Sequence, residues 1–306
     1  MALHPKIAEI LAGFPAPEPG PLDPAAMRAQ EEAQVPPLAD RIPVAEVRDD
    51  AADGVPVRVY RDGAEPGVLV YVHGGAFFLG SLDTHDHVAR SLAVETGMTV
   101  VSVGYRRAPE AAFPAGLDDV LTTVRWVDEH GDELGQEPGR LGTLALVGDS
   151  SGGTFVAAAV AQLHDEGFDR VTHQVLYYPS LDLDFDEDRY PSLRENAVGY
   201  GMETAGLRPF NAFYLDSGAD PADPRVSPIK RDDLSGLPPA LILTAEHDPL
   251  RDESERYGER LRAAGVPTTV SRYDGAGHGF VQHFGWLPEY HRAYVETAEF
   301  LRGGTA

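Results

Sequence analysis

The stretch Leu144-Ala145-Leu146-Val147-Gly148-Asp149-Ser150-Ser151-Gly152-Gly153 decides the fold of this chain. Its first four residues form a continuous apolar run, which is typical of a strand buried on both faces of a parallel sheet. The glycines that follow allow a sharp turn, and the small residues after them favour a helix. A serine at such a strand-to-helix turn presents its hydroxyl above the sheet. The pattern therefore predicts a nucleophile elbow.

The Gly-x-Ser-x-Gly spacing selects Ser150 rather than Ser151 as the nucleophile. Ser151 is expected to supply a backbone N–H on the first helical turn, where unpaired amides and the positive end of the helix dipole face a developing oxyanion. The motif is short, and a glycine-rich turn without chemistry has the same letters. Its interpretation therefore depends on the rest of the chain.

The chain around this motif alternates short β-branched runs with longer helical patterns. Alternation of this kind predicts an α/β fold, with a largely parallel sheet covered by helices on both faces. The expected strands are residues 55–60, 68–73, 98–104, 144–148, 171–178, 240–245 and 268–273. The expected helices are residues 84–96, 115–130, 151–166, 251–264 and 288–302.

Two segments depart from the alternation. Residues 1–45 contain two short helical patterns on either side of a proline-rich run at residues 15–21, and Asp23-Pro24 is typical of a helix start. Residues 180–238 have acidic, aromatic and proline character, and they are too many for an ordinary connection. We expect the first segment to be an amphipathic attachment and the second to be a cap insertion.

A second glycine-rich motif, His73-Gly74-Gly75-Ala76-Phe77, follows the expected strand at residues 68–73. Two consecutive glycines directly after a strand let backbone N–H groups approach a ligand atom, as the second wall of an oxyanion hole requires. We therefore expect the amides of Gly74 and Gly75 to join that of Ser151. An ordinary turn is the alternative reading of this motif alone.

A serine hydroxyl is a poor nucleophile until a base takes its proton, so Ser150 needs a histidine that is held by a carboxylate. Of the 11 histidines, His278 lies in a glycine-rich loop after the last expected strand. Asp248 follows the preceding expected strand, and catalytic groups of open α/β sheets gather at the carboxyl ends of the strands. The chain order Ser150, Asp248, His278 is that of an α/β-hydrolase.

With these motifs the chain resembles the hormone-sensitive lipase-like family of α/β-hydrolase esterases, also called bacterial esterase family IV. The matching segments occur in the family's order and are His73–Phe77, Leu82–Asp86, Tyr105–Glu110, Phe113–Ala115, Gly148–Gly153, Asp248–Glu253 and His278–Phe280. The resemblance implies an α/β-hydrolase fold, with a mostly parallel central sheet, helices on both faces and a helical cap. The expected domains are a cap of residues 1–45 and 180–238 and a catalytic domain of residues 46–179 and 239–306.

The resemblance also implies site residues. The triad would be Ser150, Asp248 and His278, and the oxyanion hole would be the amides of Gly74, Gly75 and Ser151. Aromatic side chains on or near the cap could line a pocket for short acyl chains, or they could form the core of the cap. The expected substrate-binding residues are Phe77, Tyr200 and Phe210.

Three positions depart from the commonest family pattern. Ala76 stands where the glycine run usually continues, Ser151 replaces an alanine, and Ser254 replaces a glycine. The donated groups are backbone amides, so none of these changes removes a catalytic atom. The methyl group of Ala76 is expected to crowd bulky alcohols or branched acyl groups.

The composition excludes several classes of protein. With 25 basic and 49 acidic residues, the formal net charge is −24, which repels nucleic acid and anionic lipid. The absence of cysteine removes disulfides, thiol nucleophiles and cysteine zinc sites. Neither a leader pattern nor a run of about 18 apolar residues occurs, so we expect a cytoplasmic protein with no membrane partner.

No metal or cofactor is expected. The acidic run Asp182–Asp188 has the spacing of a calcium loop, but Glu187 stands where the loop needs glycine. His85 and His87 are interpreted as structural, and Arg106 and Glu110 as an internal ion pair.

Together these features predict a serine carboxylic ester hydrolase that acts on short-chain acyl esters, small molecules, through an acyl-enzyme. A hydrolase of amides, carbamates or lactones could use the same groups, and only the pocket distinguishes it. A non-catalytic ligand-binding relative is a second alternative, although the intact Ser150, Asp248 and His278 argue against it. For the oligomeric state, a homodimer is one expectation.

Overall fold

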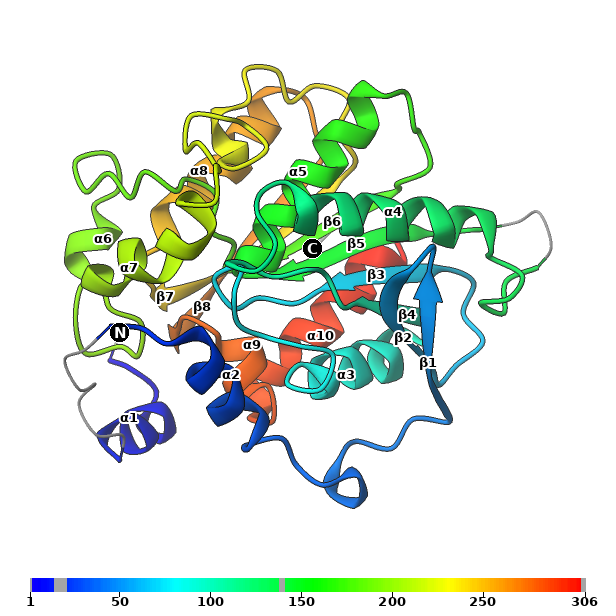
Figure 1. Ribbon diagram of the computed structural model, residues 1–306, viewed down its shortest axis with the longest axis horizontal. Helices are drawn as coiled ribbons and strands as arrows, with labels where there is room; N and C mark the ends of the chain where they lie inside the picture. The colour runs from blue at the N-terminus through cyan, green and yellow to red at the C-terminus, as the bar shows by residue number, and fades with distance from the viewer. Residues whose placement is uncertain (1, 14–20, 138–140, 304–306) are drawn as a thin grey trace.

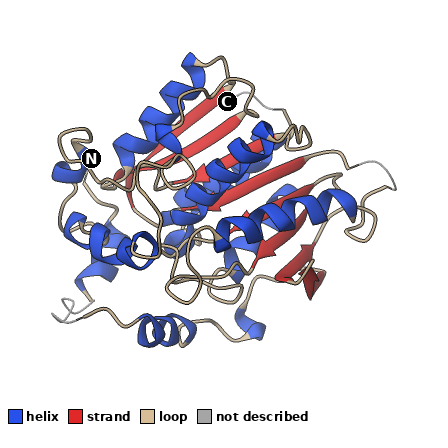
Figure 2. Cartoon of the chain, turned by 45° about the horizontal axis from the view of Figure 1, so that its top comes forward, coloured by secondary structure: helices blue, strands red, loops and turns tan. Residues whose placement is uncertain are grey.

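A central sheet with helices on both faces organises the computed structural model, which describes residues 2–13, 21–137 and 141–303 (Figures 1 and 2). Within these residues the sheet has eight strands in the order β1-β2-β4-β3-β5-β6-β7-β8. The strands from β4 to β8 pair in parallel, whereas β1–β2 and β2–β4 pair antiparallel. The expected α/β-hydrolase architecture is therefore confirmed. The strands are β1 (Glu46–Ala52), β2 (Val55–Arg61), β3 (Val68–Val72), β4 (Thr99–Val103), β5 (Leu144–Asp149), β6 (His173–Tyr177), β7 (Ala240–His247) and β8 (Thr268–Gly277).

The helices cover the sheet in two layers. Along β3, Val68, Val70 and Val72 pack into one apolar cluster with α4, α5 and α8. The alternating residues Leu69 and Tyr71 pack into the other cluster with α3, α9 and α10. The helices are α1 (Pro5–Ala12), α2 (Pro24–Glu32), α3 (Asp86–Thr96), α4 (Ala115–Glu129), α5 (Ser151–Asp165), α6 (Ser192–Glu195), α7 (Thr204–Leu215), α8 (Arg251–Ala263), α9 (Phe280–Phe284) and α10 (Pro288–Leu301). Since both faces of β3 are covered, its residues are all buried and apolar, as its sequence indicates.

The seven expected strands correspond to β2 to β8, and the five expected helices correspond to α3, α4, α5, α8 and α10. Strand β1 lies outside the expected strands. It pairs with β2 across the turn Asp53-Gly54, whose residues both have positive φ, at 47° and 91°. An Asp-Gly pair is a strong hairpin signal, so the sequence did contain the information.

The two segments outside the alternation form helices but no strand within their described residues. In the N-terminal segment, Asp23 caps α2 by accepting hydrogen bonds from the amides of Ala25 and Ala26. The proline-rich run lies almost entirely outside the described residues. Between β6 and β7 the chain forms α6, α7 and a short 3₁₀ helix, Pro228–Lys230. Helices α1, α2, α6 and α7 lie at one end of the molecule, at left in Figure 1.

None of the helices in the described chain combines the length and the apolar character that a membrane span requires.

Candidate active site

Ser150 lies between the end of β5 and the start of α5, in a backbone conformation that is rare for a residue with a side chain. Its φ is 52° and its ψ is −120°. The neighbouring glycines permit the turn, because a Cβ on Gly148 would lie 2.5 Å from the Gly152 carbonyl oxygen. A Cβ on Gly152 would lie 2.1 Å from the carbonyl oxygen of Val72 in β3. Helix α5 thus begins too close to β3 and β5 for a side chain at Gly148 or Gly152. The turn between β5 and α5 holds Ser150 at the carboxyl end of the sheet.

His278 lies between Ser150 and Asp248 and contacts both. Its Nε2 is 2.9 Å from the Ser150 Oγ, and its Nδ1 is 2.8 Å from the Asp248 Oδ2. Asp248 is buried and also accepts a hydrogen bond from the amide of Leu250 at 2.8 Å. Three side chains that follow β5, β7 and β8 are therefore joined in one hydrogen-bonded chain, as the sequence predicts.

The loop after β3, residues 74–80, requires one correction to the expected oxyanion donors. The amide of Gly74 donates to the Asp149 Oδ1 at 3.0 Å, so this N–H is already occupied and is directed at a buried carboxylate. By contrast, the amides of Gly75 and Ala76 have no protein acceptor within the described residues, and both residues are half-buried between the buried Gly74 and Phe77. The donors that the geometry leaves for a ligand in this loop are Gly75 and Ala76, not Gly74.

Ser151 is the first residue of α5, where the amide has no partner within the helix. Its backbone position matches the expectation for a third donor. Its side chain has a contact that the sequence did not indicate, because the Phe77 amide donates to the Ser151 Oγ at 3.2 Å. The hydroxyl thus connects the elbow to the loop after β3.

A buried polar pair lies beneath this loop. Asp149 accepts a hydrogen bond from the Tyr71 hydroxyl at 2.7 Å in addition to the one from Gly74. Among the described residues its second oxygen, Oδ2, has no hydrogen-bond partner, and it lies 3.8 Å from the Nε2 of His85, which has none there either. Burial raises the pKa of Asp149 to about 6, although the Tyr71 and Gly74 hydrogen bonds oppose the shift. Burial likewise lowers the pKa of His85 well below its usual range.

The expected pocket residues occupy two places. Phe77 is buried and stacks on Tyr214 of α7, with the ring centres 4.0 Å apart. Phe210, also on α7, lies 6.0 Å from Phe78. Tyr200 lies elsewhere and stacks on His247, the residue before Asp248, at 4.5 Å. Phe77 and Phe210 therefore belong to an aromatic contact between the loop after β3 and α7, and Tyr200 does not.

The carboxylates and the histidine considered above as metal ligands bind other protein groups. The carboxylates of Asp182 and Asp184 pair with Arg189 and Lys230. His87 donates from Nε2 to the carbonyl oxygen of Gln282 at 2.6 Å. In the part of the chain that the structure describes, no group of three His, Asp or Glu residues could hold a metal ion.

The expected ion pair between Arg106 and Glu110 is wrong. Arg106 binds Asp119 at 2.8 Å, whereas Glu110 binds Arg28 of α2 at 2.7 Å. Both residues lie in one loop, and sequence proximity did not reveal that the partner of Glu110 comes from the N-terminal segment.

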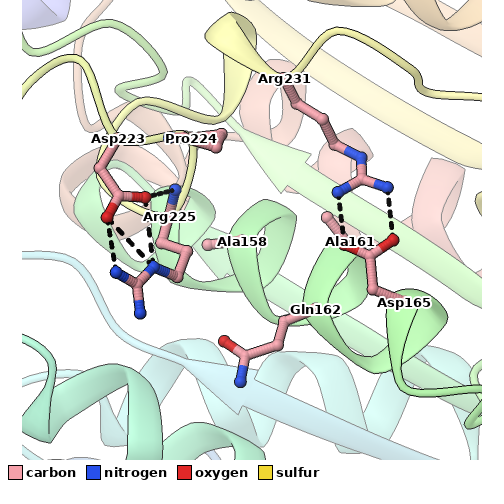
Figure 3. Close-up of a pocket in the computed structure, with 8 residues that line it drawn as sticks. All are labelled: Ala158, Ala161, Gln162, Asp165, Asp223, Pro224, Arg225 and Arg231. Carbon is pink, nitrogen blue, oxygen red and sulfur yellow. Dashed lines mark hydrogen bonds and ion pairs between the residues drawn. The ribbon is translucent and has the colours of Figure 1, made fainter.

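A surface pocket of about 230 Å³ lies away from Ser150, between the later turns of α5 and the segment before β7 (Figure 3). Its two arginines each bind an aspartate, Arg225 to Asp223 and Arg231 to Asp165. These pairs leave the pocket without a free charge to select a ligand. The lining residues are Ala158, Ala161, Gln162, Asp165, Asp223, Pro224, Arg225 and Arg231.

A serine–histidine–aspartate chain at the carboxyl ends of a mostly parallel, doubly covered sheet is the arrangement of an α/β-hydrolase. A family model described as an alpha/beta hydrolase fold matches residues 69–282, and the chain belongs to this family, in its hormone-sensitive lipase-like branch.

Individual relatives agree with the family. The chain is 41% identical over 222 residues to the esterase LipI of Mycobacterium tuberculosis, in an alignment that covers 72% of this chain and 67% of LipI. It is 45% identical over 217 residues to the carboxylesterase NlhH of the same organism, which covers 69% of this chain and 66% of NlhH. The alignments thus span about two thirds of these relatives. The structure of a hyperthermophilic esterase from the archaeon Pyrobaculum calidifontis matches with a TM-score of 0.88 at 37% identity and covers 99% of both chains.

Proposed function

We propose that this protein is a serine carboxylic ester hydrolase that acts on short-chain acyl esters through an acyl-enzyme. The observation that carries the proposal is the position of His278, 2.9 Å from the Ser150 hydroxyl and 2.8 Å from the Asp248 carboxylate. The family and its esterase members support the reaction class.

In the proposed mechanism, Ser150 attacks the ester carbonyl while His278 takes the hydroxyl proton. His278 then gives this proton to the leaving alcohol, and a water molecule repeats the attack on the acyl-enzyme to release the acid. Asp248 keeps the imidazole oriented, with Nδ1–H toward its own carboxylate, and stabilises the imidazolium that forms. No step requires a metal or an organic cofactor.

The oxyanion hole in this proposal consists of the amides of Gly75, Ala76 and Ser151. Donors of this kind act on charge that develops only in the transition state, and removing one typically costs about 10²- to 10³-fold in kcat. Gly74 has a different role, because its amide is bound to Asp149.

We further propose that residues 1–45 and 180–238 form a cap over a catalytic domain of residues 46–179 and 239–306. The stacking of Phe77 on Tyr214, and the approach of Phe78 to Phe213 at 4.7 Å, support a cap that lies against the oxyanion side of the site. Phe77 and Phe210 then bound the substrate pocket. For Tyr200 the contact with His247 supports a position beside the loop that carries Asp248. The cytoplasmic location and the homodimer stay predictions.

Two measurements test the proposed function. A series of p-nitrophenyl esters from C2 to C16 should give the highest kcat/KM at short chains, and parallel amide and lactone substrates should react far more slowly. A fluorophosphonate probe should label the peptide that contains Ser150, as detected by mass spectrometry, and Ser150→Ala should not be labelled. A chain that neither hydrolyses the esters nor reacts with the probe would instead be a ligand-binding relative.

A further inference from the structure

We propose that Arg28, on helix α2 of the N-terminal segment, is a positioning residue for the oxyanion hole. Residues 74–80, which contain two of the proposed donors, are called the oxyanion loop below. The inference rests on the proposed function, because positioning matters only if this loop binds an oxyanion. It concerns a residue outside the matched family region, which begins at residue 69.

The oxyanion loop cannot hold its shape by local preference alone. Ala76 and Phe77 have φ values of 48° and 67°, in the left-handed region that side chains disfavour. Such conformations persist only where the surrounding structure enforces them. The contacts that surround the loop therefore determine where the Gly75 and Ala76 amides lie.

The catalytic domain supplies two contacts to the middle of the loop. The Phe77 amide donates to the Ser151 Oγ at 3.2 Å, and the Phe77 carbonyl accepts from the Ala108 amide at 3.0 Å. These contacts hold one residue of the loop at the side of the elbow. A third contact from this domain, from the Arg107 guanidinium to the Gly80 carbonyl oxygen, holds the far end of the loop. It leaves the Phe78 carbonyl and the Gly80 amide to other partners.

Helix α2 binds these two remaining groups. Arg28 Nε donates to the Phe78 carbonyl oxygen at 2.7 Å, and its Nη2 donates to the Ala108 carbonyl oxygen at 2.6 Å. One turn further along α2, the Glu31 Oε2 accepts from the Gly80 amide at 3.1 Å. The guanidinium is planar and rigid, so it fixes the Phe78 and Ala108 carbonyls relative to each other.

Arg28 is itself held in place. Glu110 binds it through two hydrogen bonds of 2.7 and 2.9 Å, and the Arg28 side chain is only 15% exposed. Helix α2 has no fully buried residue, although Met27 packs against the core. Polar contacts therefore account for much of the attachment of α2 to the catalytic domain. They are made to the oxyanion loop and to the loop that contains Ala108 and Glu110.

The expected consequence of losing Arg28 is a change in kcat. Oxyanion donors act in the transition state, and a misplacement of about 1 Å in an active site can cost about 10²-fold. Because Ser151 and Ala108 still hold Phe77, and Arg107 still holds Gly80, we expect a smaller loss, of about ten-fold. The KM for a small ester should change by less than about two-fold, since Arg28 contacts the loop and not the triad.

Four variants test the proposal. For each, three quantities are measured: kcat and KM for p-nitrophenyl butyrate, the melting temperature of the protein, and the rate of hydrogen exchange in a peptide that spans the oxyanion loop. Arg28→Met removes every donor but keeps an apolar stem, and it should lower kcat and speed exchange in the loop. Arg28→Lys keeps one charged donor group but cannot bind both carbonyl oxygens as the planar guanidinium does, so its kcat should lie between those of Arg28→Met and the wild type. Glu110→Gln removes the charge of the ion pair, but its amide oxygen can still accept from Arg28, and both Arg28 contacts to carbonyl oxygens remain. This variant should keep kcat within about two-fold.

Arg231→Met is the matched control, because Arg231 also binds one carboxylate twice, that of Asp165, and donates to a backbone carbonyl, far from Ser150. It should leave kcat and loop exchange unchanged. Two results would overturn the proposal: wild-type kcat and exchange in Arg28→Met, or equal losses of kcat and melting temperature in Arg28→Met and Glu110→Gln. A wild-type protein without ester hydrolysis would refute the proposed function instead, while the exchange data would still show whether Arg28 holds the loop.

Discussion

The amide of Gly74 donates to the carboxylate of Asp149 at 3.0 Å, and this contact sets the direction of the chain as it leaves β3. Gly74 has to be glycine for the contact to form, since a Cβ there would lie 2.6 Å from the Asp149 Oδ2. With this peptide turned toward the buried carboxylate, the next two amides, of Gly75 and Ala76, are free for a ligand. Asp149 thus orients the proposed oxyanion hole from beneath, one residue before the nucleophile.

Replacement of the two adjacent serines should separate their roles. Ser150→Ala removes the nucleophile and should lower kcat for p-nitrophenyl butyrate by about 10⁴-fold or more, because the triad acts as a unit. Ser151→Ala keeps the backbone amide and loses only the hydroxyl that accepts from Phe77, so it should retain most of the activity. Comparable losses in the two variants would contradict the assignment of Ser150.

The hydrogen bond between Asp248 and His278 predicts a large effect of Asp248→Asn. The amide can present its NH₂ group to His278 and favour the wrong tautomer, so kcat should fall by about 10⁴-fold with little change in the fold. Asp252→Asn, on the first turn of α8, is the control and should stay near wild type. Steady-state kinetics and circular dichroism together decide the outcome, and an Asp248 variant with more than a tenth of wild-type kcat would remove Asp248 from the triad.

The raised pKa of Asp149 predicts a pH dependence of stability. Its carboxyl group keeps a proton in the folded protein at pH values where the unfolded chain has lost it, because burial raises its pKa from 3.8 to about 6. The associated stability is fully present below about pH 3.8 and is lost as the pH rises through 6. Burial lowers the pKa of the neighbouring His85 well below its usual range.

Asp149→Asn removes this titration and keeps an oxygen that can accept from Tyr71 and Gly74. Its melting temperature relative to wild type should therefore rise as the pH increases from 4 to 7. Asp165→Asn is a suitable comparison, since the Arg231 hydrogen bond lowers the pKa of Asp165, and it should show no trend between pH 5 and 7. A melting-temperature difference for Asp149→Asn that does not vary with pH would show that Asp149 does not titrate in this range.

The approach of Ser150, Asp248 and His278 to one another could be predicted from the sequence because it follows from the sheet topology. Parallel strands end at one edge of the sheet, so residues that follow β5, β7 and β8 must converge there. Apolar runs and glycine-rich turns located those strand ends closely enough. Strand β1 was harder to predict, because it is an edge strand in which four of seven residues are charged and only Ala52 is buried, so it carries no alternating apolar pattern.

The direction of an amide and the partner of a long side chain could not be predicted in this way. Nothing in His73-Gly74-Gly75 indicates which N–H faces the carboxylate of Asp149, since that depends on one peptide rotation in the folded chain. Arg28 lies 50 residues from Phe78, and no periodicity or spacing connects them. Such contacts depend on packing between separate segments, and only the three-dimensional structure reveals them.

Ala76 predicts how selective the site is for substrate shape. It is half-buried beside the free amides, with a φ of 48°, a backbone conformation that favours glycine. Ala76→Gly should raise kcat/KM for a branched ester such as p-nitrophenyl isobutyrate about three- to ten-fold relative to the linear butyrate, since one methyl group of space is worth about 1 kcal/mol or more. The melting temperature should rise slightly, because the greater freedom of glycine in the unfolded chain, about 0.5–1 kcal/mol, offsets only about half of the strain relieved, about 1–2 kcal/mol. The ratio of the two kcat/KM values is the decisive measurement, because an equal change for both esters would mean that the methyl group affects the oxyanion donors and not the space for the substrate.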